Sequence, residues 1–215
     1  SNSFTGEIPP GIGNMEYLNY LVLGGNNFSG YIPTEIGNLT NLEEFNLWGN
    51  NLSGELPSEI GSLSSLERLW IDGNDFSGSI PESIGDLPNI YSINLSGNQL
   101  SGLIPESICN LELDWEQWDD QMGLYNELSN NQLCPPYPEC LTEENIGYQD
   151  TSECIDCPDS IEGDIDGDGE VTILDIVLIV NCILSNDCDE CSDLNYDGSV
   201  DILDIILMIN IILEP

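Results

Sequence analysis

Residues 42–57 read LEEFNLWGNNLSGELP, and this stretch decides the fold of the first half of the chain. Leu42, Phe45 and Leu47 alternate with polar residues, which is typical of a short strand with one buried side. Asn50 follows, and then a Leu-Ser-Gly-x-Leu-Pro segment whose Gly and Pro predict a turn. One such unit cannot bury its own apolar side, so we expect copies of it to stack.

The pattern recurs every 24 residues without slippage. Its asparagines are Asn2, Asn26, Asn50, Asn74 and Asn98. Repeats of this length form the coils of a solenoid, in which short parallel strands point their leucines into a shared core. We expect each Asn to hydrogen-bond backbone groups of neighbouring coils. Because the chain opens within a repeat, we also expect its natural start, with any secretion signal, to precede Ser1.

The next coil is irregular. Asn131 follows Asn98 by 33 residues instead of 24, so about nine residues are inserted near Trp115 and Trp118. A solenoid needs an atypical last unit, because its final coil would otherwise expose an apolar edge. We therefore interpret residues 112–157 as a C-terminal cap. It is expected to be stapled by four cysteines in a pairing that the sequence leaves open: Cys109, Cys134, Cys140 and Cys154.

The charge balance narrows the possible partners. The chain has 40 acidic residues, Arg68 as its single base and no His, for a formal charge of −39. Such a surface repels nucleic-acid phosphates and anionic lipids, and it attracts cations. The lack of His excludes imidazole catalysis and His-containing metal sites. No run of about 18 apolar residues is present, so no membrane span is encoded.

The cysteine count indicates an oxidising, extracellular compartment. The eight cysteines form an even set of disulfide candidates: Cys109, Cys134, Cys140, Cys154, Cys157, Cys182, Cys188 and Cys191. The two Cys-x-x-Cys pairs also fit a zinc site or a redox motif. We favour disulfides, because the other features of the chain point outside the cell.

Two acidic loops near the C-terminus predict calcium sites. Residues 164–175 read DIDGDGEVTILD and residues 193–204 read DLNYDGSVDILD, each followed by an apolar helix. Oxygen donors at positions 1, 3, 5, 9 and 12, a backbone carbonyl at position 7 and Gly at position 6 suit the shell of Ca²⁺. The predicted ligands of two Ca²⁺ ions are Asp164, Asp166, Asp168, Glu170, Thr172, Asp175, Asp193, Asn195, Asp197, Ser199, Asp201 and Asp204.

These patterns resemble two known families. Residues 1–111 resemble the 24-residue leucine-rich repeat common in plant receptor ectodomains, with its L-S-G-x-I-P signature. Residues 158–215 resemble a type I dockerin, since position 12 of each loop is Asp where an EF-hand has Glu and no helix precedes either loop. The dockerin resemblance implies two structural calcium ions, a pseudo-twofold pair of antiparallel helices and docking to a cohesin.

The expected partner surface departs from the usual dockerin pattern. Dockerins commonly carry small or polar residues at loop positions 10 and 11 and basic residues further along the helix. Here those positions hold Ile173, Leu174, Ile202 and Leu203, and no base follows. Both helices are apolar nearly all round, which indicates burial against a second surface. That surface belongs to a cohesin-like protein, another copy of the chain or the solenoid cap, unless each helix packs only on its twin.

The solenoid itself offers a second binding surface. Side chains that alternate with the core leucines point outward from each strand and form three columns. The candidate ligand-binding residues on this concave face are Tyr20, Glu44, Trp48, Arg68, Trp70, Asp72 and Asn94. The aromatic rings suit a sugar or a peptide. Arg68 and Glu44, one coil apart, are alternatively a simple ion pair.

The sequence therefore predicts an α/β leucine-rich-repeat solenoid followed by a small all-α calcium-binding module. The favoured function is a secreted or cell-surface, non-enzymatic binding protein. Its solenoid recognises a protein, peptide or glycan, and its dockerin-like module anchors it to a partner. Two alternatives remain: a self-assembling subunit of an extracellular filament or surface layer, and a non-catalytic component of a polysaccharide-degrading complex. Catalysis is not expected, because a thin solenoid lacks the deep cleft that a glycosidase needs.

Overall fold

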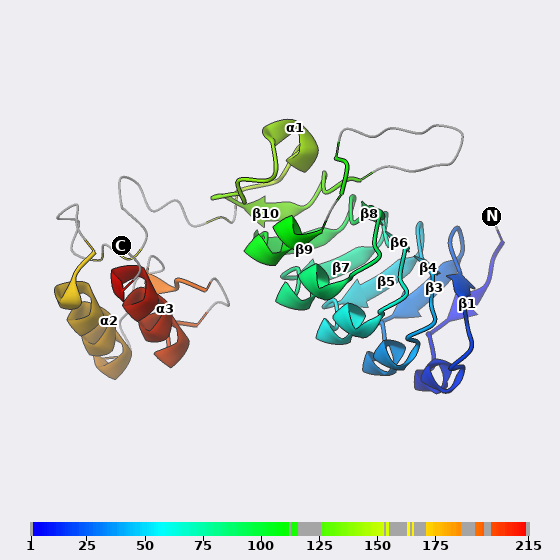
Figure 1. The fold of residues 1–215 in the computed structure, drawn as a ribbon, viewed down its shortest axis with the longest axis horizontal. Helices are drawn as coiled ribbons and strands as arrows, with labels where there is room; N and C mark the ends of the chain where they lie inside the picture. The colour runs from blue at the N-terminus through cyan, green and yellow to red at the C-terminus, as the bar shows by residue number, and fades with distance from the viewer. Residues whose placement is uncertain are drawn as a thin grey trace. The chain divides into compact units, whose positions relative to one another are not determined.

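The computed structural model describes residues 2–111, 113–115, 126–152, 154, 163, 165, 171–185, 192–195 and 199–213. The chain divides into two compact units, Ser1–Glu153 and Cys154–Pro215. The first is a stack of coils and the second contains a pair of helices (Figure 1). The predicted fold class is confirmed. The finer division into repeats, cap and calcium module stays a prediction.

A four-stranded parallel sheet forms one side of the first unit. Its strands, in spatial order, are β2 (Tyr20–Val22), β4 (Glu44–Asn46), β6 (Arg68–Trp70) and β8 (Ser92–Asn94). Residues one repeat apart are paired, as in Leu21 with Phe45 and Leu69 with Ile93. The middle residue of each strand is buried and its two neighbours lie on the opposite side of the sheet. We call this outer side the concave face.

A second parallel sheet was not expected from the sequence. Its six strands are β1 (Thr5–Gly6), β3 (Asn27–Gly30), β5 (Asn51–Gly54), β7 (Asp75–Gly78), β9 (Gln99–Leu103) and β10 (Gln132–Cys134). The Leu-Ser-Gly segment, interpreted as a turn, alternates a buried apolar residue with an outward serine and so has strand periodicity. Its glycine adopts a positive φ, 81° at Gly54, which only Gly adopts at little cost.

Short 3-10 helices complete the coils. They are η1 (Pro10–Asn14), η2 (Thr34–Asn38), η3 (Ser58–Ser62), η4 (Glu82–Asp86) and η5 (Glu106–Asn110). Each follows a proline, whose fixed φ suits the start of a helix. Gly37 in η2 lets the next coil approach, since a Cβ there would lie 2.8 Å from Cβ of Glu59.

An asparagine ladder holds the coils together, as predicted. Asn74 Nδ2 donates to the carbonyls of Leu47 (3.0 Å), Ile71 (3.0 Å) and Asp72 (3.3 Å), and its Oδ1 accepts from Leu52 N (3.1 Å). The equivalent bonds recur at three further buried positions: Asn50, Asn98 and Asn131. Because these carbonyls and amides are buried, each ladder residue supplies partners that water cannot.

Gln149 and a disulfide close the last coil. Gln149 Oε1 accepts from Leu133 N (3.2 Å), and its Nε2 donates to Leu128 O (3.0 Å), so it takes the place of the next ladder asparagine. Cys109 and Cys140 are joined in a disulfide with Cα atoms 5.7 Å apart. Three more described cysteines are also disulfide-bonded: Cys134, Cys154 and Cys182. The short helix α1 (Glu143–Ile146) begins at a capping box.

The second unit is built around α2 (Ile173–Ser185) and α3 (Ile202–Leu213), which contact each other. Its small core centres on Ile179, Leu194 and Met208. Both helices are apolar nearly all round, yet within this unit much of that apolar surface is exposed, including Leu184 and Leu213. None of the helices that the structure describes is long and apolar enough to span a bilayer.

Candidate calcium loops and concave face

Asp175 closes the first predicted calcium loop. Its Oδ1 accepts from the backbone N of Ile165 (2.8 Å), and its Oδ2 accepts from N (2.8 Å) and Oγ1 (3.3 Å) of Thr172. Ile165 occupies loop position 2 and Thr172 position 9. The carboxylate at position 12 therefore ties the beginning of the loop to its end.

Asp204 makes the equivalent closure in the second loop. Its Oδ1 accepts from the backbone N of Leu194 (2.8 Å) and of Asn195 (3.1 Å), and its Oδ2 accepts from N of Asp201 (2.7 Å). Positions 2 and 9 are again joined through position 12. The sequence duplication thus reappears as a duplicated hydrogen-bond pattern.

Both closing carboxylates lie in a unit whose sequence contains no Lys, Arg or His. Asp175 and Asp204 are fully buried, and the only base in the sequence, Arg68, belongs to the other unit. A buried carboxylate is costly unless it is paired or coordinates a metal. An oxygen-only donor set suits Ca²⁺ and disfavours zinc, which takes nitrogen and sulfur. The described part of each loop therefore fits calcium.

Seven of the twelve predicted ligands lie within the described residues: Thr172, Asp175, Asp193, Asn195, Ser199, Asp201 and Asp204. The remaining five lie outside them: Asp164, Asp166, Asp168, Glu170 and Asp197. Within the described part of the chain, no three acidic or cysteine side chains gather into a metal cluster. Three disulfide candidates also lie outside the described residues: Cys157, Cys188 and Cys191.

An exposed apolar pair begins each helix. Ile173 and Leu174 are 72% and 53% exposed, and Ile202 and Leu203 are 68% and 49% exposed. Loop position 9 caps both helices in the same way. In the first loop, Thr172 Oγ1 accepts from Leu174 N (3.1 Å). In the second loop, Asp201 Oδ1 accepts from Leu203 N (2.8 Å). The two predicted partner-binding pairs, Ile173–Leu174 and Ile202–Leu203, therefore have the same position in the loop, the same capping contact and similar exposure.

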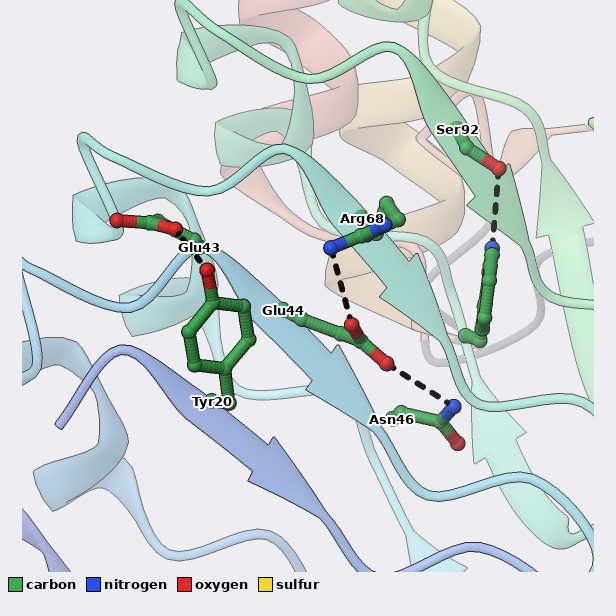
Figure 2. Close-up of polar contacts among 7 residues, drawn as sticks. Tyr20, Glu43, Glu44, Asn46, Arg68 and Ser92 are labelled. Carbon is green, nitrogen blue, oxygen red and sulfur yellow. Dashed lines mark hydrogen bonds and ion pairs between the residues drawn. The ribbon is translucent and has the colours of Figure 1, made fainter. Parts of the chain in front are cut away.

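Polar contacts order the side chains of the concave face (Figure 2). The Tyr20 hydroxyl donates to Glu43 Oε2 (2.7 Å), which raises the pKa of Tyr20 and, with a bond from Asn19, lowers the pKa of Glu43. The ion pair expected from neighbouring coils is present, with Arg68 Nη2 3.0 Å from Glu44 Oε2. These contacts hold the face in a defined arrangement.

The two tryptophans of this face are held differently. Trp70 Nε1 donates to Ser92 Oγ (3.0 Å). Trp48 is half exposed, and its indole occupies the space that a side chain at Gly24 would fill. Gly24 and Trp48 stand in the same column of the predicted face, so the missing Cβ of one gives room to the ring of the other.

Asn94 does not offer its side chain to a ligand. It is 1% exposed, and its Oδ1 accepts from N (3.0 Å) and Oγ (2.7 Å) of Ser96. Its place in the strand predicts an outward, ligand-binding side chain, but in the structure that side chain is covered. Short polar residues in such columns are buried when larger neighbours cover them, which alternation alone does not reveal.

Asp72 is the most perturbed carboxyl of the face. Burial, and to a lesser extent the negative charge of Glu127, raise its pKa to about 6 against the lowering effect of a backbone hydrogen bond. Glu127 extends the face by one coil, since it pairs with Asn94 in a parallel bridge. Glu127 is not among the predicted residues of this face. The repeat pattern predicts its position, because Glu127 precedes Asn131 by four residues, as Asn94 precedes Asn98.

We expect Asp72→Asn to stabilise the first unit at neutral pH. An acid with a folded pKa near 6 and an unfolded pKa near 3.8 binds protons more tightly when folded, so its cost to stability is absent below about pH 4 and complete above about pH 6. After allowance for solvent screening, the gain is about 1–2 kcal/mol. Urea unfolding followed by tryptophan fluorescence, at neutral and at acidic pH, measures it.

The matched control is Asp75→Asn, an exposed position on the second sheet. It is expected to leave the free energy of unfolding unchanged at both pH values. Equal effects of the two variants, or a gain from Asp72→Asn that does not vanish in acid, would contradict the burial of charge at Asp72.

Comparison with family models identifies both halves of the chain. Residues 162–213 match the model described as dockerin type I domain. Four segments match the leucine-rich-repeat model: residues 17–39, 41–63, 65–87 and 89–111. No curated protein matches the chain.

Several plant receptor ectodomains share the fold of the solenoid. The chain is 38% identical to the plant peptide hormone receptor RGFR1 in complex with RGF2, covering 61% of this chain and 20% of that one with a TM-score of 0.56. It is 38% identical to a TDR receptor (64% and 22%, TM-score 0.57). It is 36% identical to the Arabidopsis receptor kinase HAESA in a complex with the peptide hormone IDA and SERK1 (62% and 21%, TM-score 0.56). The chain thus spans about a fifth of the length of these structures.

Proposed function

The chain is a leucine-rich-repeat solenoid followed by a dockerin type I domain, and from this premise we propose that it is an extracellular, calcium-dependent, non-enzymatic binding protein. Dockerin domains bind calcium and attach to a protein partner. Leucine-rich-repeat ectodomains of the matched type are extracellular binding modules. The solenoid is the recognition part, and the dockerin domain is the anchor.

The observation that carries the proposal is the duplicated presentation of apolar residues at the calcium loops. The pairs at Ile173–Leu174 and Ile202–Leu203 are largely exposed and leave the loops at the same position. Exposed aliphatic side chains grouped on a small unit mark a protein interaction site. Because Asp175 and Asp204 close the two loops through the same bonds, we propose that each loop holds one calcium ion.

Two further observations support the extracellular role. Disulfides such as Cys109–Cys140 persist in oxidising compartments. The matched RGFR1 and HAESA structures are complexes of plant receptors with the peptide hormones RGF2 and IDA. By analogy we propose that the concave face, with Tyr20, Trp48 and Trp70, is the recognition surface. The favoured anchor partner is a cohesin-like protein.

Replacing the four exposed apolar residues by aspartate is expected to abolish anchoring. The variant carries Ile173→Asp, Leu174→Asp, Ile202→Asp and Leu203→Asp. We expect it to lose at least about a hundredfold in affinity for a type I cohesin module, since charged side chains would replace an apolar contact. Calorimetric titration of the full chain in calcium with a panel of purified cohesins measures this. Leu184→Asp, an equally exposed change at the far end of α2, is the control and should bind normally.

Three outcomes would contradict the proposal, two of them about anchoring. One is a quadruple variant that binds as well as the parent. The other is a parent chain that binds no cohesin but assembles with itself in calcium, seen by analytical ultracentrifugation, which would identify a structural subunit instead. Sugar release from a polysaccharide by the purified chain would likewise contradict a non-enzymatic role.

A further inference from the structure

The concave face combines exposed aromatic rings with unbalanced negative charge. Tyr20, Val22 and Trp48 are half exposed, and Trp70 is partly exposed beside them. Such a row of apolar side chains on one sheet face marks a binding surface for another molecule. The charges around it restrict which molecule fits.

The aromatic side chains are already ordered without a ligand. The Trp70 indole donates a hydrogen bond to Ser92, and the Tyr20 hydroxyl donates one to Glu43. The Trp48 ring packs over Gly24, in the space that a Cβ there would occupy. A ligand that stacks on these rings therefore loses less free energy to ordering them. Figure 2 shows that the contacts of Tyr20, Arg68 and Ser92 span neighbouring strands of the sheet.

The carboxylates of the face outnumber its positive charge. Arg68, the only base of the chain, is already paired with Glu44 at 3.0 Å. Asp72 is half buried, and no positive side chain contributes to its environment. Glu127 Oε1 accepts from the neutral hydroxyl of Ser129 (2.6 Å). Apart from Arg68, the sequence contains no Lys, Arg or His side chain that could pair with these two groups.

Trp48, Trp70 and Asp72 come from two adjacent coils of the solenoid. Trp48 precedes Asp72 by one repeat, and its coil is joined to the coil of Asp72 by the bond from Gly49 N to Asp72 O (2.8 Å). Trp70 lies two residues before Asp72 and therefore on the same side of the sheet. Indole faces attract cations, and a partly buried carboxylate pairs with them strongly. An anionic ligand would meet repulsion here.

We propose that the concave face binds a basic peptide segment, with an arginine or lysine side chain lying against Trp48 and Trp70 and paired with Asp72. This inference rests on the proposed role of the solenoid as the recognition module and specifies the chemistry of its ligand. Guanidinium is favoured over ammonium, because it stacks on aromatic rings and donates to carboxylates at the same time. A neutral glycan would use the rings but leave Asp72 and Glu127 uncompensated.

The test compares two labelled peptides of equal length, one of repeating Gly-Arg-Ser and one with citrulline in place of arginine. Citrulline keeps the shape of arginine and removes its charge. Fluorescence anisotropy with the full chain, in calcium and at physiological salt, should show binding of the arginine peptide and at least about tenfold weaker binding of the citrulline peptide. Neutral oligosaccharides, measured by tryptophan fluorescence, should not bind.

Two pairs of charge-removing substitutions distinguish peptide binding at the concave face from general attraction to the negative charge of the chain. Asp72→Asn with Glu127→Gln should weaken binding of the arginine peptide by about tenfold or more. Glu55→Gln with Asp75→Asn removes the same charge from exposed positions elsewhere on the solenoid and should weaken it less than about twofold. Trp48→Ala should weaken binding of the arginine peptide as much as Asp72→Asn with Glu127→Gln does. Urea unfolding followed by tryptophan fluorescence checks that the solenoid of every variant is folded, and the cohesin titration checks that the variant anchors normally.

Three results would overturn the inference: no binding of the arginine peptide, equal loss in both charge pairs, or equal binding of the citrulline peptide. Binding of an oligosaccharide that is lost in Trp48→Ala would show that the face recognises glycans and not basic peptides. None of these results alters cohesin binding, which tests the anchoring role separately. Failure of the cohesin titration with intact peptide binding would reject the anchor and keep this inference.

Discussion

Exhaustive removal of calcium is expected to unfold the C-terminal unit and leave the solenoid intact. The fully buried core of that unit contains only Ile179, Leu194 and Met208 among the described residues. Burying the carboxylates of Asp175 and Asp204 is costly, and a bound cation offsets that cost. In such a unit, the free energy of binding the metal is free energy of folding.

The folding of the two units can be followed by two different spectroscopic signals. Helices α2 and α3 contain 13 and 12 residues against four in α1, so circular dichroism at the helix band follows the C-terminal unit. Every tryptophan lies before residue 154, so indole fluorescence follows the solenoid. Chelation should remove most of the helix band, leave the fluorescence unchanged, and be reversed by excess calcium.

Asp175→Ala and Asp204→Ala should weaken the same unit even in calcium. Each change removes the carboxylate that ties loop position 2 to position 9 and that we propose as the calcium ligand at position 12. Ser185→Ala, an exposed change at the end of α2, serves as the control and should behave as the parent. A helix band that survives both complete demetallation and these substitutions would refute calcium-dependent folding.

Asn74→Ala is expected to cost the solenoid about 2–4 kcal/mol, because it leaves a buried amide and buried carbonyls without partners. Urea unfolding followed by tryptophan fluorescence gives the free energy of unfolding. The loss should be similar at Asn50 and Asn98, which occupy the same place in neighbouring coils.

Asn26→Ala is the matched control at the edge of the ladder. Asn26 makes the same kinds of bond, to Phe4 N, Leu23 O and Gly24 O, but its surroundings are more exposed. Water can replace these partners, so the cost should be under about 1 kcal/mol. Equal losses at Asn26 and Asn74 would mean that residue type, and not burial within the stack, determines the contribution.

Short-range patterns in the sequence were sufficient for most of the fold. A 24-residue period predicted the stacked coils, the buried leucines and the asparagine ladder, because each coil contacts only its neighbours and repeats the same local solution. The loop spacing predicted calcium, because ligand positions within twelve residues are fixed by the loop itself. The second sheet was overlooked, although Leu52 and Ser53 alternate as strand residues do. The Gly and Pro that follow these residues are equally typical of a turn, so the local sequence does not distinguish the two structures.

Other features depend on residues that the sequence separates and only the tertiary structure brings together. The pairing of Cys109 with Cys140 follows from the path of the chain through the irregular coil, which no spacing rule specifies. The environment of Asp72 depends on its depth in the sheet and on Glu127, 55 residues away. Burial and electrostatic coupling are properties of position in three dimensions. The sequence therefore determined the repeating framework and the calcium loops, and the packed structure decided which polar side chains of the concave face are covered and which carboxylates remain without a counter-charge.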